Sequence, residues 1–428
     1  MKPTVAVIGS GISGMASAYY LRRDFDVTLI DRNNYIGGHT NTITIHEGGR
    51  NIPIDTGFMV FNDSTYPNLV RLFEELGVTS YNTSMSFGVQ NKDQALEFAC
   101  GGFSSYFAQR KNLFKPKHWK LYRGILAFFK AADEFMAEKE DYELSVAEFA
   151  RRFAIADSVV RNFILPMTAA IWSTPPERVL QSPALPLLRF MHNHRMLGIG
   201  IQLQWKTVEG GSDQYKEKLI AQLPREPQTN RVISRVGETE DSAYFYDENG
   251  QKQSFDHIIV ATHANQALAL LENPTPAQSK LLSNFKYNSN SAILHSDESI
   301  MPQAKSAWAS WNVSHTKNEN GHECSSTHYW MNSLQKIDSQ RNYFVSIDYE
   351  GSLASESIHW QTMYTHPLFD THAIKAQPQL HALNENGRIK FCGSYFRNGF
   401  HEDGLWSSLN VVRELMKVKG GKNELLPL

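Results

Sequence analysis

The fold of this chain is decided near its start by the stretch Val5-Ala6-Val7-Ile8-Gly9-Ser10-Gly11-Ile12-Ser13-Gly14. A β-branched run leads into three glycines spaced G-x-G-x-x-G, and residues 15–22 read as a helix. Gly9 allows a tight turn, Gly11 lets a pyrophosphate approach the backbone, and Gly14 lets the helix pack closely on its strand. The stretch therefore predicts a strand, a turn and a helix whose N-terminus holds phosphate groups.

An acidic residue completes this unit. A second apolar run at residues 27–30 predicts another strand and delivers Asp31 at roughly the 20-residue separation of a carboxylate that binds a ribose hydroxyl. The alternative is a glycine-rich turn in some other βαβ unit. We predict a dinucleotide site that includes Gly9, Gly11, Ser13, Gly14, Asp31 and Arg32.

Length and composition bound the class of protein. A chain of 428 residues is too long for one compact core, so two intertwined domains are expected. The net charge of −2 gives no nucleic-acid signature, and no apolar run reaches the roughly 18 residues of a membrane span. Cys100, Cys324 and Cys392 form neither a metal pattern nor a disulfide framework. With no apolar leader at the N-terminus, we expect a reduced cytoplasmic protein without a bound metal.

A second pair of glycines indicates which dinucleotide is bound. Gly37-Gly38-His39 follows Asp31, and Asp55-Thr56-Gly57 precedes an apolar run that contains Met59. FAD needs this additional backbone because its pyrophosphate and ribityl chain run further before the isoalloxazine ring, whereas NAD does not. On these residues the chain resembles the FAD-dependent amine oxidase and phytoene desaturase superfamily. The resemblance implies that Gly37, Gly38 and the backbone of His39 continue the pyrophosphate site, and that Gly57 and Met59 lie toward the flavin ring.

A later glycine pair extends the resemblance. Gly210-Gly211 precedes an expected helix at 214–223, a strand from Asn230 and a buried strand at 255–261. The resemblance implies that Val232 lies near the adenine and that the turn at Thr262 closes the sheet. A simple β-meander is the alternative.

The C-terminal region is expected to reach the reactive half of the flavin. Gly393 ends a strand, and Asp403 occupies the position of an N-cap for a helix at 405–417. Gly404 and Leu405 would begin that helix, whose free N–H groups favour the electron-rich edge of a reduced flavin.

Other stretches resemble a narrower group, namely bacterial FAD-binding proteins related to the flavoprotein-like N-terminal region of plant cyclopropane fatty acid synthases. They include Leu165-Pro166-Met167, Met191-His192-Asn193-His194 and His366-Pro367-Leu368-Phe369-Asp370. The resemblance covers nearly the whole chain. It implies desaturation of methylated fatty acyl chains of phospholipids on the route to furan fatty acids. Cys392 lies in no flavin-attachment motif, so we expect noncovalent FAD.

These patterns predict an α/β fold, with a Rossmann-like FAD-binding domain and a discontinuous, amine oxidase-like α+β substrate domain. The FAD-binding domain is expected at residues 1–62, 205–283 and 386–428, and the substrate domain at 63–204 and 284–385. Within the latter we expect a helix at 66–76, strands at 283–295 and 343–348, and a loop at 314–326, which is polar and lacks apolar periodicity.

One segment combines basic and aromatic residues. Residues 98–132 contain no acid, and their Lys and Arg residues interleave with Phe, Trp and Tyr. Such a segment can lie on an anionic membrane surface, which would make the protein peripheral at the inner face of the membrane. The alternative is a solvated helix face above ordinary core aromatics.

Candidate catalytic residues follow from the expected position of the flavin. His401 and Glu402 lie between the glycine-ended strand and the last helix, and Tyr395 could line the ring face. Histidine suits proton transfer near neutral pH, and desaturation needs a base for the proton that leaves beside the hydride. The alternatives are that Glu402 and Asp403 cap the helix, that His401 packs in the core or binds ribityl oxygens, and that Tyr395 packs in the core.

The substrate is expected to be a lipid or another hydrophobic molecule. Many amine oxidases of the superfamily carry a lysine near the flavin in the strand that corresponds to residues 289–295, and this chain has none there. Amine oxidation and carotenoid-type desaturation remain alternatives, as does a non-catalytic flavin-binding partner of a lipid-modifying enzyme.

Overall fold

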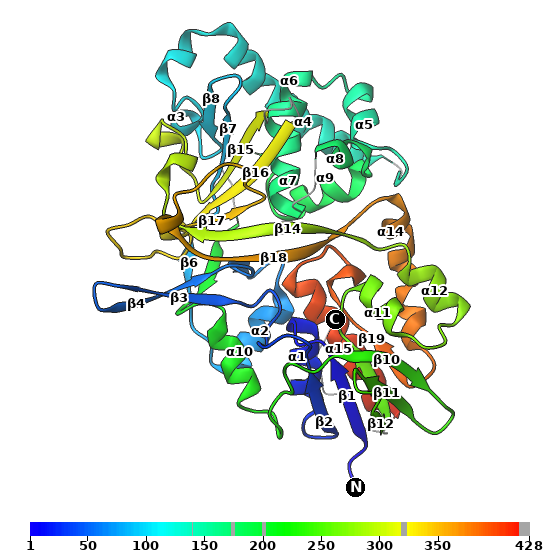
Figure 1. Cartoon of the computed structure of the whole chain (residues 1–428). Coiled ribbons are helices and arrows are strands. Elements are labelled where there is room, and N and C mark those ends of the chain that lie inside the picture. Colours follow the sequence, from blue (N-terminus) through cyan, green and yellow to red (C-terminus); the bar gives the residue numbers. More distant parts are fainter. Residues whose placement is uncertain (139, 173–175, 199–202, 318–322, 419–428) are drawn as a thin grey trace.

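The protein is described by a computed structural model that covers residues 1–138, 140–172, 176–198, 203–317 and 323–418. It forms two lobes (Figure 1). The lower lobe contains the N-terminus, and the upper lobe contains most of the helices between residues 103 and 193. Two long strands, β14 (Lys286–His295) and β18 (Ile358–Leu368), cross the molecule where the lobes meet.

A parallel sheet forms the centre of the lower lobe. Its order is β19 (Ile389–Phe391), β13 (His257–Val260), β1 (Thr4–Ile8) and β2 (Asp26–Ile30). Most of its residues are buried, because both faces of the sheet are covered. Its four strands come from the three separate segments that we assigned to the FAD-binding domain.

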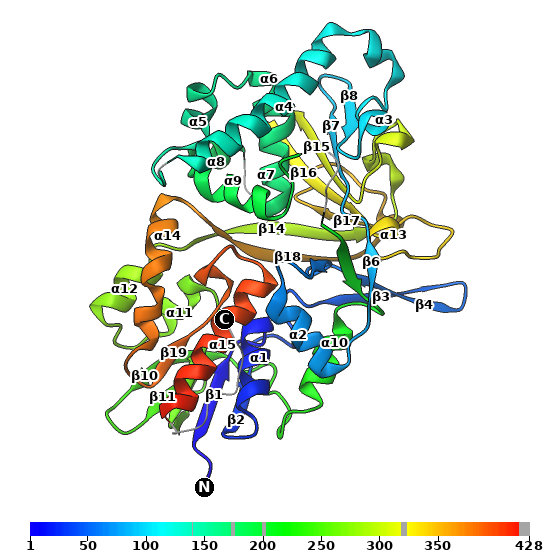
Figure 2. The ribbon, with the colours of Figure 1, turned by 180° about the vertical axis from the view of Figure 1, so that it is seen from behind.

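Helices α1 (Ile12–Leu21) and α15 (His401–Val418) pack together on one face of this sheet. Small residues allow the close approach, and the hydroxyls of Ser17 and Ser408 are hydrogen-bonded at 2.8 Å. The last helix begins at His401, four residues earlier than predicted. Figure 2 shows α15 lying alongside α1 from behind.

The other face of the parallel sheet carries an antiparallel meander. Its strands are β10 (Ile233–Glu238), β11 (Ala243–Asp247) and β12 (Lys252–Phe255), and α11 (Ala264–Leu270) and α12 (Pro276–Leu282) pack beside it. The strand predicted from Asn230 begins at Ile233, and the strand predicted at 255–261 is divided between β12 and β13. The meander and the closing strand of the parallel sheet therefore both exist.

The upper lobe is built on a seven-stranded sheet. Its order is β18, β14, β17 (Phe344–Ile347), β16 (Glu323–Trp330), β15 (Trp311–Lys317), β7 (Phe87–Asn91) and β8 (Leu96–Ala99). The predicted strands at 283–295 and 343–348 are present as β14 and β17. The loop predicted at 314–326 is wrong, because β15 and β16 pair antiparallel on either side of residues 318–322, which lie outside the described residues. The buried residues Ser314, His315, Ser326 and Thr327 explain why this hairpin lacks an apolar pattern.

Helices cover one face of this sheet and enclose a second apolar core. They are α3 (Phe103–Tyr106), α4 (Pro116–Ala137), α5 (Val146–Arg152), α6 (Asp157–Val159), α7 (Leu165–Trp172), α8 (Pro176–Gln181) and α9 (Ala184–Asn193). The basic and aromatic segment thus forms α3, a short 3₁₀ turn at Arg110–Phe114 and most of α4. None of the described helices is long and apolar enough to span a membrane.

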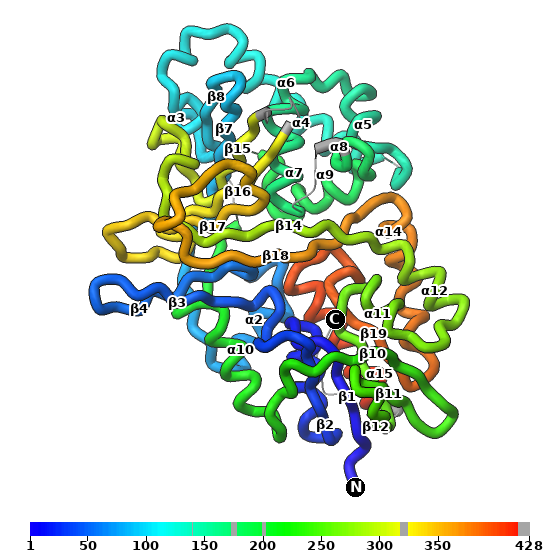
Figure 3. The backbone as a smooth tube through the Cα atoms, in the orientation of Figure 1, coloured from blue at the N-terminus to red at the C-terminus, as the bar shows by residue number. Residues whose placement is uncertain are grey.

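Smaller elements complete the two lobes on either side of β14 and β18 (Figure 3). They are the hairpin of β3 (Thr42–Glu47) and β4 (Arg50–Asp55), the sheet of β5 (Phe61–Asn62), β9 (Trp205–Val208) and β6 (Ser80–Thr83), and the helices α2 (Pro67–Leu76), α10 (Asp213–Ile220), α13 (Met331–Leu334) and α14 (Thr371–Ala376). The predicted helix at 66–76 is confirmed as α2, and Gly77 ends it with φ +61°. Because β9 pairs with strands from residues 61–62 and 80–83, the lobes share backbone hydrogen bonds.

Candidate active site

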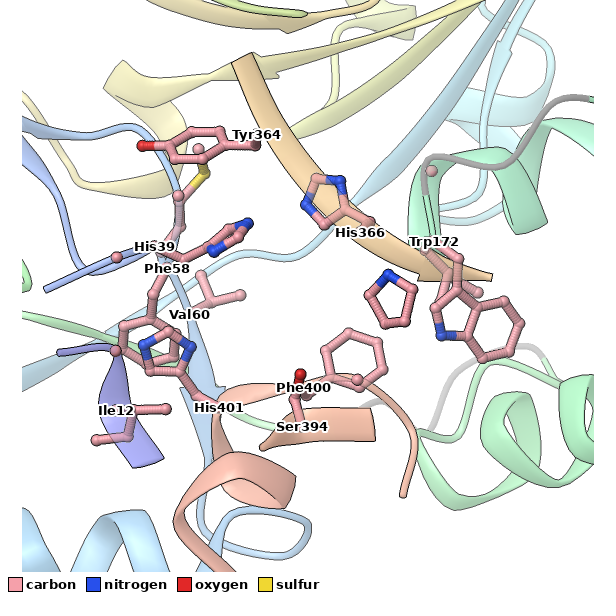
Figure 4. Close-up of a pocket in the computed structure, with 18 of the residues that line it drawn as sticks. Ile12, His39, Phe58, Val60, Trp172, Tyr364, His366, Ser394, Phe400 and His401 are labelled. Atoms are coloured by element: carbon pink, nitrogen blue, oxygen red, sulfur yellow. The ribbon is translucent and has the colours of Figure 1, made fainter. Parts of the chain in front are cut away.

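A cavity of about 1420 Å³ runs from the glycine-rich turn into the upper lobe. A drug-sized ligand usually occupies about 300–1,000 Å³, so this space is large enough for a cofactor and a substrate together. Figure 4 shows its middle part, with His39, Tyr364 and His366 on one side and Ser394, Phe400 and His401 opposite them.

The glycine-rich turn has the geometry that the sequence predicts. Gly9 has φ +101°, which favours glycine, and a Cβ on Gly14 would collide with the carbonyl oxygen of Gly9. A Cβ on Gly11 would meet no atom within 4 Å, so the space in front of this residue is open. The three glycines therefore serve the turn, the approach of a ligand and the packing of α1.

Most of the predicted cofactor residues line this cavity. They are Gly9, Gly11, Ser13, Asp31, Arg32, Gly38, His39, Gly57, Met59, Val232, Thr262 and Gly393. Gly38 approaches the turn so closely that its Cβ would lie 3.3 Å from the Cα of Gly11. The two glycine motifs are thus brought together.

Asp31 is held in a fixed orientation at the end of β2. One carboxylate oxygen accepts hydrogen bonds from the Ser10 backbone N–H at 2.8 Å and the Ser10 hydroxyl at 2.6 Å, and the other accepts the Asn33 N–H at 2.9 Å. The carboxylate therefore lies at the edge of the cavity beside the phosphate turn, where a ribose hydroxyl would bind.

Other predicted cofactor residues serve the packing of the fold. Gly14 and Gly37 are absent from the cavity lining, and the Gly37 N–H donates to the Ser10 hydroxyl at 3.2 Å. Gly404 and Leu405 do not line it either. Gly404 lets α15 approach α1, since a Cβ there would lie 2.8 Å from the Ser13 hydroxyl, and Leu405 is buried in the core of the lower lobe. Their predicted contact with the flavin finds no support in the lining of the cavity and stays a prediction.

Asp403 is not the N-cap of α15, because the helix begins at His401. Its carboxylate turns back and accepts the backbone N–H groups of Phe400 at 2.9 Å and Asn398 at 3.2 Å. Burial raises the pKa of Asp403 to about 6 despite these hydrogen bonds. Asp403 thus fastens the start of α15 and does not line the cavity.

Glu402 caps a different helix. Its carboxylate accepts the Asn68 backbone N–H at 3.2 Å, the Asn68 side-chain amide at 2.6 Å and the Leu69 N–H at 3.0 Å, at the N-terminus of α2. Such a contact satisfies amides that have no partner within their own helix. Glu402 therefore holds the start of α2 and does not line the cavity, which gives no support to its predicted catalytic role.

His401 lines the cavity, but its Nε2 atom is engaged by the protein. It lies 3.1 Å from both the Thr40 hydroxyl and the Tyr215 hydroxyl, and the ring stacks on Phe58 at 4.0 Å. Burial lowers the pKa of His401 to about 3. Two hydroxyls thus occupy Nε2, and the ring is fixed as a wall of the cavity, an arrangement that gives no support to the predicted base.

Tyr395 also lines the cavity. Its side chain is buried between Phe285 and Phe396, and burial raises the pKa of its phenol well above the ordinary value. Its hydroxyl, like His39 Nε2 and His263 Nδ1, is buried without a hydrogen-bond partner among the described residues. Because buried polar atoms are normally paired, three such atoms around one cavity favour a polar ligand.

Sequence reasoning missed a chain of three polar side chains. The Asn290 amide donates to the Asp348 carboxylate at 2.5 Å, which directs the amide oxygen toward His366 Nδ1 at 2.8 Å. Since that oxygen can only accept, Nδ1 carries the proton and Nε2 keeps its lone pair. His366 lines the cavity, and its ring centroid is 5.1 Å from that of His39. The sequence signal was confined to a family-like stretch around His366, and Asn290 and Asp348 gave none.

The upper end of the cavity is an apolar chamber. It is lined by Phe87, Tyr122, Ile125, Leu126, Phe129, Phe163, Met167, Ala170, Ile171, Phe190 and Trp311. His194 lies at its side with its ring stacked on Phe190 at 3.9 Å, while His192 is exposed and 3.7 Å from Asp133. Among the described residues that line the whole cavity, Asp31 is the single acid, and it lies at the dinucleotide end.

Comparison with known proteins identifies the family. Residues 12–341 match the model of the flavin containing amine oxidoreductases. The chain belongs to this family. Over 157 residues it is 31% identical to phytoene desaturase of Cercospora nicotianae, which is 35% of this chain and 23% of that protein. Matches to the curated relatives span only 14–23% of their length.

Solved structures share the fold over nearly the whole chain. A fatty acid isomerase from P. acnes that produces CLA superimposes with a TM-score of 0.65 at 13% identity, over 97% of this chain and 98% of that one. Cyclohexylamine oxidase from Brevibacterium oxydans gives a TM-score of 0.67 at 16% identity, over 97% and 100%. The predicted family, α/β fold and FAD cofactor are confirmed.

The residues around the cavity fit FAD. The phosphate turn, Asp31 and the unpartnered polar atoms lie along one continuous space that ends below the apolar chamber. Cys392 does not line this space, and burial raises the pKa of its thiol to about 12, consistent with the predicted noncovalent binding. Among the described residues, no group of three or more His, Cys, Asp or Glu side chains could hold a metal ion.

Proposed function

We propose that the protein is an FAD-dependent dehydrogenase that desaturates an apolar acyl chain, with methylated fatty acyl groups of phospholipids as the substrate class. The observation that carries this proposal is the apolar chamber, which continues directly from the cofactor end of the cavity and has no carboxylate among its described lining residues. An acyl chain gains free energy from burial in such a chamber, at about 0.8 kcal/mol for each methylene group.

The side chains divide the remaining work. Bound FAD supplies the hydride acceptor. Phe190 and Phe400, stacked at 4.9 Å, and Trp172, 5.2 Å from Phe190, form a wall that excludes water from the reacting carbons. His366 takes the proton that leaves the neighbouring carbon, because its Nε2 lone pair is free and Asn290 holds the ring in that tautomer.

Burial, together with the nearby His39 and His263, lowers the pKa of His366 to about 3. The ring is therefore in the neutral form that can accept a proton from the substrate.

Anaerobic reduction of the bound flavin tests the proposal. Purified holoenzyme is mixed without oxygen with phospholipids that carry methyl-branched acyl chains, straight-chain phospholipids as a control, polyamines, cyclic amines and phytoene. Loss of the yellow flavin absorbance with the methyl-branched lipids alone supports the proposal. Absence of bleaching with any of these compounds favours a non-catalytic flavin-binding partner and refutes it.

Amine oxidation is the second candidate, and the aromatic wall favours it. Phe190, Phe400 and Trp172 line the cavity, and aromatic rings can attract amines. However, β14 has no lysine at residues 289–295, where many amine oxidases carry one near the flavin. Lys286, at the start of the strand, is exposed and lies 3.7 Å from Asp370. Bleaching with amines alone would establish this candidate, and bleaching with phytoene alone would establish carotenoid-type desaturation.

A further inference from the structure

One surface of the upper lobe combines exposed aromatic side chains with cations. This basic–aromatic surface belongs to α3, the turn at Arg110–Phe114 and the first half of α4, at the upper end of the molecule in Figure 1. Phe114 is 88% exposed and Phe103 is 53% exposed, which is unusual for large apolar side chains. The cations of this surface are Arg110, Lys111, Lys115, Lys117, Lys120 and Arg123.

The charge of this surface is not neutralised within the protein. Residues 98–132 contain no acid, and none of these six cations forms an ion pair within the described part of the chain. The surface is therefore complementary to an extended anionic one.

A rigid aromatic cluster supports the exposed rings. Phe107 is completely buried and lies 4.6 Å from Phe103 and 4.8 Å from Trp119, measured between ring centroids. The Trp119 indole N–H donates to the Leu113 carbonyl at 2.9 Å, which fixes the turn that carries Phe114. Some aromatics of the segment thus form an ordinary core, while Phe103 and Phe114 are presented to the outside.

The surface borders the substrate cavity. Gly101 and Gly102 line the cavity immediately before Phe103, and Leu126, one turn after Arg123 on α4, is 38% exposed and lines the cavity as well. A lipid that leaves a membrane in contact with this surface would reach the chamber without crossing the lower lobe.

We propose that the basic–aromatic surface docks on an anionic phospholipid bilayer, with Phe103 and Phe114 at the level of the headgroups, and that the substrate enters the chamber from there. Cations beside exposed aromatics bind such surfaces because Coulomb attraction adds to the burial of apolar area. The choice of substrate rests on the proposed function, whereas the docking is a separate property of the surface.

Vesicle flotation tests the docking without turnover. The holoenzyme is mixed with straight-chain phosphatidylcholine vesicles, with or without phosphatidylglycerol. The wild type is expected to float only with the anionic vesicles. Neutralising Lys111, Lys115, Lys117 and Lys120 with glutamine should weaken binding about fivefold for each lysine that contacts the surface, and Phe114→Ser should weaken it several-fold more.

A matched control removes the same charge elsewhere. Lys2, Lys252, Lys280 and Lys286 are exposed and lie outside this surface, and their replacement by glutamine should leave flotation unchanged. Equal binding by the two quadruple variants, equal binding of wild type to both kinds of vesicle, or no binding at all overturns the proposal. Flavin reduction by detergent-dispersed lipid, measured alongside, reports on the proposed function independently of the docking.

Discussion

Replacing Glu402 by alanine separates a structural role from a catalytic one. The change removes three accepted hydrogen bonds at the N-terminus of α2, two from Asn68 and one from Leu69. Loss of a helix cap costs about 0.5–2 kcal/mol, and loss of a negative charge at a helix N-terminus costs about 0.3–1 kcal/mol. Because Leu69 is completely buried, water cannot easily replace its partner. We therefore expect a loss of about 2–3 kcal/mol in the free energy of unfolding.

Urea unfolding of the holoenzyme, followed by flavin and tryptophan fluorescence, measures this loss. Glu402→Gln retains one oxygen for Asn68 and should lose about half as much. Glu74→Ala, at an exposed position of the same helix, is the control and should change stability by less than about 0.5 kcal/mol. The variant should keep the flavin spectrum and its rate of flavin reduction. Unchanged stability combined with abolished flavin reduction would refute the structural role and restore Glu402 as a catalytic residue.

Three further predictions concern the cavity and the start of α15. His366→Gln should slow anaerobic flavin reduction about 10²–10⁴-fold while FAD content stays constant, and a rate equal to wild type would exclude His366 as the proton acceptor. For substrates of increasing acyl length, KM should fall roughly fourfold per methylene until the chamber is full, and a KM independent of length would contradict binding of the chain there. The raised pKa of Asp403 means that the folded state holds this proton more tightly, so its stabilising contribution is complete below about pH 4 and is lost as the pH rises through about 6. Between pH 4 and 7 the free energy of unfolding in urea should therefore fall by about 3 kcal/mol less in Asp403→Asn than in the wild type. An identical pH profile in the two proteins would disprove the assignment.

The dinucleotide end of the site could be predicted because backbone geometry specifies it locally. Gly9, Gly11 and Gly14 lie within six residues. Gly9 is required by the turn and Gly14 by close packing, while Gly11 leaves open space for a ligand. Asp31 is fixed by Ser10 in the neighbouring turn. The sequence of strands and glycine motifs was therefore sufficient for the parallel sheet and the cofactor.

The other half of the site depends on contacts between distant residues. Glu402 and Asn68 are 334 residues apart, and Asn290 and His366 are 76 apart on paired strands. No local pattern distinguishes a carboxylate that caps its own helix from one that caps another. The hairpin of β15 and β16 was missed for a related reason, since its buried positions hold polar residues such as Ser314 and Thr327.

The hydrogen bonds that orient His366 also bear on the choice between the two candidate reactions. Desaturation removes a hydride from one carbon and a proton from its neighbour, so it needs a proton acceptor beside the chain. A neutral amine loses its hydride from the carbon next to nitrogen, and the nitrogen lone pair stabilises the cation that forms, so no acceptor is needed in that step. Asn290 and Asp348 hold His366 in one tautomer, and this arrangement supplies the proton acceptor that desaturation needs. His366→Gln should therefore abolish flavin reduction by acyl chains but spare any reduction by amines, and equal loss with both would remove this argument for desaturation.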